Sequence, residues 1–127
     1  MALKLSVNSL TTGLTFHGEV QGKRQHYYIL SSARQYFVMS VSSSKRDAGN
    51  FNLVSKSAVD RLYRLLRGQQ GLTARHVFNR TRNRRLVPSS LAALNILYVL
   101  VAIDCASIDM RHKSSREIFF NMRRPQN

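Results

Sequence analysis

The apolar residues of this chain change their spacing once, near residue 54. Before that point they alternate with polar residues, clearly at 3–7 and 14–20, and β-rich runs follow at 26–30 and 35–41. After it, Ala58, Val59, Leu62 and Leu66 recur at intervals of three and four. Alternation buries one face of a strand, whereas the longer period buries one face of a helix. The sequence therefore predicts an α+β fold, with a sheet first and helices after it.

The first part, residues 1–54, is predicted to be a β-rich subdomain with a small antiparallel sheet. A last short strand at 51–54 brings the expected number to about five. Between 42 and 50 lie three serines, Lys45, Arg46 and a Gly-Asn pair, which predict a basic loop. A sheet of this size cannot easily stand alone, so we expect it to pack on the second part.

The second part, residues 55–127, is predicted to hold three helices and a closing hairpin. The first helix starts at either Ser57 or Ser55, both of which suit an N-cap, and ends at Gly68. Thr73 is expected to cap a short second helix, and the third spans about 89–103. Strand-like runs at 107–110 and 117–122 flank a basic tip at 111–116, and a short basic tail follows at 123–125.

This order of elements, with the segments GLTARHV at 71–77 and LAALNIL at 91–97, resembles the winged helix-turn-helix superfamily over about residues 55–122. The resemblance implies a three-helix unit with a β-hairpin wing. It also implies binding of double-stranded DNA, through the start of a helix in the major groove and a wing on the phosphates.

The net charge of the chain also favours nucleic-acid binding. Twenty Lys and Arg stand against six Asp and Glu, which gives a formal net charge of +14 and a pI of about 11.3. Fifteen of the twenty cations are Arg, whose planar guanidinium forks onto phosphate oxygens. Such a surface attracts polyanions, and nucleic acid is the favoured class.

The predicted nucleic-acid contacts lie where the resemblance and the charge coincide. They comprise the second helix, the arginine run before the third helix, the start of that helix and the hairpin tip: Thr73, Arg75, Arg80, Arg82, Arg84, Arg85, Ser89, Ser90, Arg111, Lys113 and Arg116. Secondary contacts, by stacking or to the backbone, are expected where cations and aromatic residues alternate in the first part: Lys23, Arg24, Tyr27, Tyr28, Arg34, Tyr36, Lys45 and Arg46.

The third helix departs from a typical recognition helix, because it is apolar almost all round, with Asn95 and Tyr98 as its clear polar residues. Such a helix is usually buried on every side. Either only its first turn reaches DNA, with the arginine run before it contributing most of the binding, or its surplus apolar face is covered. Two arrangements would cover that face: packing against the N-terminal sheet, or a homodimer formed through helix 89–103.

Other classes of function find little support. The six carboxylates are scattered, the four histidines are isolated, and the glycines form no phosphate-binding loop, so we expect no enzymatic activity, no metal and no cofactor. The single cysteine, Cys105, excludes an intrachain disulfide. No apolar run approaches the roughly 20 residues of a membrane span. With no signal-peptide pattern, a reduced, intracellular setting is expected.

The sequence thus predicts a nucleic-acid-binding protein with duplex DNA favoured, acting as a regulator, a chromatin-type protein or a targeting module. Two alternatives remain open at this point: an RNA-binding or ribosome-associated protein, and a structural protein whose basic face meets an acidic partner.

Overall fold

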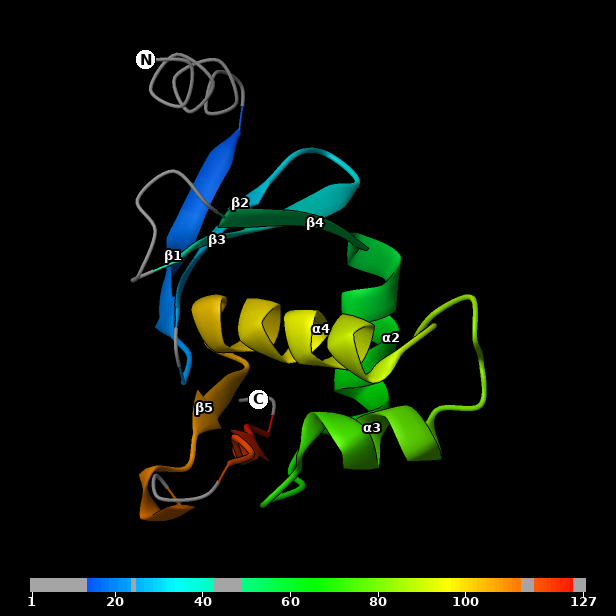
Figure 1. The fold of residues 1–127 in the computed structure, drawn as a ribbon. Helices are drawn as coiled ribbons and strands as arrows, with labels where there is room; N and C mark the ends of the chain where they lie inside the picture. Colours follow the sequence, from blue (N-terminus) through cyan, green and yellow to red (C-terminus); the bar gives the residue numbers. More distant parts are fainter. Residues whose placement is uncertain (1–13, 24, 43–48, 113–115, 125–127) are drawn as a thin grey trace.

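The computed structural model describes residues 14–23, 25–42, 49–112 and 116–124. Within these residues the first half forms one antiparallel sheet with the strands in chain order (Figure 1). Its strands are β1 (Thr15–Gln21), β2 (Gln25–Ser31), β3 (Gln35–Ser42) and β4 (Gly49–Ser55). The four predicted strands between residues 14 and 54 are confirmed, whereas the one at 3–7 falls outside the described residues. Strands β3 and β4 run further into the predicted 42–50 loop than expected, pairing up to Val41 with Gly49.

Three helices follow: α2 (Lys56–Leu66), α3 (Ala74–Arg80) and α4 (Ser90–Ala102). Each begins at a side-chain cap, which the sequence predicts for the first two. The Ser55 hydroxyl accepts from the Ala58 N–H at 3.0 Å, so Ser55 and not Ser57 caps the first helix. Thr73 and Ser89 cap α3 and α4 in the same way.

The closing hairpin is shorter than predicted. It pairs β5 (Ala106–Ile108) with β6 (Phe120–Met122), and a 3-10 helix at Met110–His112 occupies residues that were expected to form strand and tip. The Asp109 carboxylate causes this turn by accepting from the Arg111 N–H at 3.0 Å. Across β6 from β5, Leu72 forms an isolated bridge with Phe120 through two hydrogen bonds of 2.9 and 2.7 Å.

Helix α4 lies under the sheet and against the other two helices (Figure 1). Seven of its thirteen residues are buried, and all of these except Asn95 join one core cluster with Val20, Ile29 and Val38 of the sheet. Of the two arrangements expected for this apolar helix, the structure shows packing against the chain's own sheet. The reason for expecting a homodimer through helix 89–103 therefore no longer holds.

Candidate nucleic-acid interface

The segment between α3 and α4, residues 81–89, carries the predicted arginine run; we call it the arginine loop. Arg84 holds it together from within. Its Nη1 donates to the backbone oxygens of Thr81 at 2.9 Å, Phe78 at 3.1 Å and Val87 at 3.4 Å. Its guanidinium carbon also lies 3.9 Å from the centre of the Phe78 ring. Arg84 was predicted to contact phosphate, but the structure uses one terminal nitrogen and the flat face of its guanidinium to order the loop.

Asn83 fixes the middle of the same loop. Its side-chain oxygen accepts from the N–H groups of Arg85 at 3.1 Å and Leu86 at 3.2 Å, an Asx turn. Its backbone oxygen accepts from Val87, whose side chain is completely buried. Sequence analysis missed this role, although Asn is a frequent turn residue because its side chain bonds to the backbone two residues ahead. Hydrogen bonds from Arg84 and Asn83 therefore give the loop a defined turn conformation, whereas the sequence predicts only a run of basic residues.

Arg82 and Arg85 flank Arg84 and are both exposed. Neither forms a side-chain ion pair with any residue in the described part of the chain. The loop leads directly into the first turn of α4, where Ser89, Ser90 and Leu91 are exposed. The Ser89 hydroxyl accepts from the Ala92 N–H at 3.1 Å and keeps its own O–H free to donate. Two guanidinium groups and a helix N-terminus thus occupy neighbouring positions on a fixed turn.

Helix α3 contributes less than its sequence suggests. Thr73 was predicted to contact nucleic acid, but its side chain is buried, with 3% exposure for the residue, and caps the helix by accepting from His76 N–H. Arg80 donates to the side-chain oxygen of Gln69, which lies in the connection before α3. Arg75 is exposed near the start of α3.

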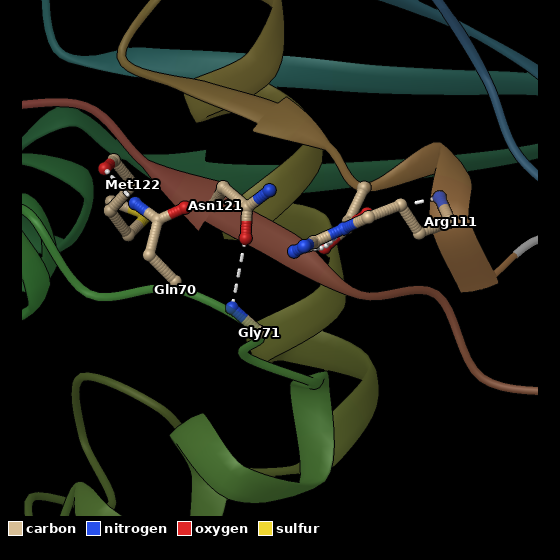
Figure 2. Close-up of polar contacts among 6 residues, drawn as sticks. Gln70, Gly71, Arg111, Asn121 and Met122 are labelled. Carbon is tan, nitrogen blue, oxygen red and sulfur yellow. Dashed lines mark hydrogen bonds and ion pairs between the residues drawn. The ribbon is translucent and has the colours of Figure 1, made fainter.

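On the hairpin, the predicted contact residue Arg111 is paired with an acid (Figure 2). Arg111 forms a two-pronged ion pair with Asp109, whose side chain is 3% exposed, with distances of 2.9 and 2.7 Å. Hydrogen bonds from the Arg111 side chain and backbone, and from Asn121, hold the pKa of Asp109 well below its usual range. Asn121 in turn accepts from the Gly71 N–H at 2.9 Å. Asn121 therefore ties the hairpin to the α2–α3 connection, while Arg111 is paired with Asp109 and offers phosphate a partly compensated charge.

The remaining hairpin residues do not complete the expected surface. Arg116 is exposed, while Lys113 lies outside the described residues. In Figure 1 the arginine loop and the hairpin lie at opposite ends of α3. The structure thus separates the two cationic groups that the sequence placed on one face.

The secondary residues are divided between the two faces of the sheet. The Tyr27 ring stacks on Tyr98 in the interior, and Tyr36 packs edge-on against His17, with Lys56 over its ring. Tyr28 pairs with Glu19 on the opposite face. Arg34 is exposed in the β2–β3 turn, and Lys23 has its own contact. Arg24, Lys45 and Arg46 fall outside the described residues. Two of the three predicted stacking rings are thus already in contact with other side chains.

Comparison with known protein families, curated proteins and solved structures gives no match for this chain. In the described part, no cluster of three or more His, Cys, Asp or Glu residues could hold a metal ion. None of the helices found there combines the length and the apolar character that crossing a membrane demands.

Proposed function

We propose that this chain binds nucleic acid through the arginine loop and the first turn of α4, with double-stranded DNA as the favoured ligand. One observation carries the proposal: Arg84 and Asn83 fix the turn from inside, and Arg82 and Arg85 project from it with no acidic partner among the described residues. A surface ordered before binding loses less entropy when it meets a ligand. Guanidinium forks and helix N-terminal N–H groups both suit phosphate oxygens.

The distribution of charge supports the same site. Four described acids are each paired with a nearby base, and these pairs are Glu19–His26, Asp60–Arg64, Asp104–Arg123 and Asp109–Arg111. Acids therefore compensate Arg64 on α2 and Arg111 and Arg123 at the hairpin, while Glu19 on β1 contacts His26 on β2. In contrast, the stretch 74–90 contains no acid at all. The net charge of +14 is thus least compensated around the arginine loop.

As part of this proposal, we assign residues 55–122 to the winged-helix class. The element order α2, α3, α4, β5, β6 supports the assignment, as does the pairing of Leu72 with β6, which places a third chain segment beside the hairpin. Because most of α4 is covered, we propose that this helix does not enter the major groove along its length as a typical recognition helix does. Since only the first turn of α4 is exposed, binding rests on phosphate contacts, and we expect weak discrimination among base sequences.

The test is a salt titration of binding to duplex DNA, single-stranded DNA and RNA of one sequence. We expect tightest binding to the duplex and a steep fall in affinity with salt. In the double variant Arg82→Ala/Arg85→Ala, the slope of log affinity against log salt should decrease by about 2.

The matched control is Arg61→Ala/Arg64→Ala, which removes the same charge from exposed positions on α2. It should bind almost as the unmodified protein does. An equal loss in both double variants would reduce the interaction to general attraction by net charge. Preference for structured RNA over duplex DNA at matched salt would make RNA the favoured ligand. No binding to duplex DNA, single-stranded DNA or RNA would overturn the proposal.

A further inference from the structure

A groove opens beside the arginine loop, between β4 and the first two turns of α4. Its volume is about 290 Å³. Leu53, Pro88 and Leu91 line it with apolar surface, Asn52 and Asn95 line it with amides, and Arg85 is also in its lining. The groove thus adjoins the surface proposed for phosphate binding.

Asn95 is the unusual residue of this groove. It is 5% exposed and lies in the middle of an otherwise apolar helix. No hydrogen bond joins its side chain to any residue of the described ranges, and its amide is not among the fully enclosed unpaired groups found there, so it faces the groove. The amide of Asn95 is therefore covered by the protein on most sides, forms no hydrogen bond to the described residues and is reachable from the groove. A ligand with both a hydrogen-bond donor and an acceptor would satisfy the oxygen and the nitrogen of the Asn95 amide.

Three properties of the groove narrow the ligand. Its volume of about 290 Å³ lies just below the range of about 300–1,000 Å³ for small-molecule sites, so it suits a small ligand. Leucine side chains on its walls suit a flat apolar surface. Arg85 is the sole cation among its described lining residues, so the interior suits a neutral group better than an anion.

We propose that the groove receives one unpaired nucleobase of the bound nucleic acid, an inference that rests on the proposed function. Asn95 would hydrogen-bond the base edge, as Asn amides do with adenine. Leu53 and Leu91 would contact the faces of the base, and Arg85 would hold the adjoining phosphate. The arginine loop then supplies binding to any nucleic acid, and the groove adds preference for a base that lies outside the stack.

The experiment compares three duplexes of one sequence at fixed salt: fully paired, with one unpaired adenine bulge, and with an abasic site at the same bulge. We expect the adenine bulge to bind about tenfold more tightly than the paired duplex, equivalent to ~1.4 kcal/mol. The unpaired base has no base pair to break on leaving the stack. The abasic bulge should bind like the paired duplex, because it provides the same flexibility without a base.

In Asn95→Leu the tenfold preference should disappear while binding to the paired duplex is kept. Leu91→Ser, at an exposed position, provides a second variant that should weaken the preference even if Asn95→Leu does not fold. Equal binding of the paired and adenine-bulged duplexes by the unmodified protein would overturn the inference and leave the proposed function standing. An abasic bulge that binds as tightly as the adenine bulge would also overturn it. Failure to bind any of the duplexes would overturn the proposed function itself.

Discussion

The rings of Tyr27 and Tyr98 stack with their centroids 4.2 Å apart and their planes at 27°. Tyr27 belongs to β2 and Tyr98 to α4, so this contact joins the sheet to the helix beneath it. Burial, followed by the charge and hydrogen bond of Tyr27, raises the pKa of Tyr98 well above its usual range, so its hydroxyl stays neutral. The pair helps to hold α4 where its side chains are covered and only its first turn is exposed.

Gly22→Ala should destabilise the protein by about 1–3 kcal/mol, the usual range for an overpacked core. An added Cβ would lie 2.6 Å from a ring carbon of Tyr27 and 2.9 Å from the Tyr98 hydroxyl oxygen, so the stacked pair must move. Thermal and urea unfolding would measure the change. In the Tyr27→Ala background the same substitution should cost clearly less, since the nearest atom is gone. Strictly additive losses would contradict this account of Gly22.

Arg84→Ala should weaken nucleic-acid binding, although the proposed role of Arg84 is to order the arginine loop and not to contact phosphate. It removes three hydrogen bonds to backbone oxygens and the contact with Phe78, so Arg82 and Arg85 would no longer be held on a fixed turn. We expect an affinity loss of about tenfold and a stability loss of about 1 kcal/mol, a low value because the side chain is exposed.

Hydrogen exchange distinguishes this positioning role from a direct contact. The amides of Leu86 and Val87, which bond to Asn83, should exchange faster in Arg84→Ala. Arg84→Lys should not rescue the loop, because an ammonium group lacks the planar face that lies over Phe78. Unchanged exchange together with weaker binding would instead indicate that Arg84 contacts phosphate directly.

Asn95→Leu should change stability by less than about 1.5 kcal/mol, because the new side chain has a similar size and no hydrogen bond to the described residues is lost. Denaturant unfolding would show the difference. Ser89→Ala provides a contrast at the same helix, since removing that N-cap should destabilise by about 1 kcal/mol. A large loss of stability in Asn95→Leu would mean that Asn95 has a structural partner.

Asp109→Asn should destabilise the hairpin at neutral pH and much less in acid. Because Arg111 lowers the pKa of Asp109 in the folded protein, its contribution is fully present above the unfolded value of about 3.9 and is lost as pH falls through the folded pKa. The difference in melting temperature between the two proteins should therefore be constant from about pH 5 to 7 and shrink below about pH 4. A difference that persists unchanged into strong acid would contradict the assigned role.

The caps and the strand-to-helix switch could be predicted because they depend on residues close together in the chain. Ser55, Thr73 and Ser89 each meet an N–H group three residues ahead, and such contacts follow from local spacing. The exposure of Arg82 and Arg85 follows from charge in the same way. Arg84 and Arg111 lie in equally basic segments, yet both side chains bond to other parts of the protein. Nothing in their local sequence distinguishes them from the exposed arginines nearby.

By itself, then, the sequence determined the order of the strands and helices from β1 to α4, the start of each helix to within two residues and the excess of positive charge. Only the tertiary structure decided that the sheet covers α4, that the hairpin and the arginine loop lie apart, and that Asn95 faces a groove. The physical reason is one of range. Periodicity and capping act over about four residues, whereas covering, ion pairing and grooves arise between segments such as β2 and α4, whose positions the whole core fixes together.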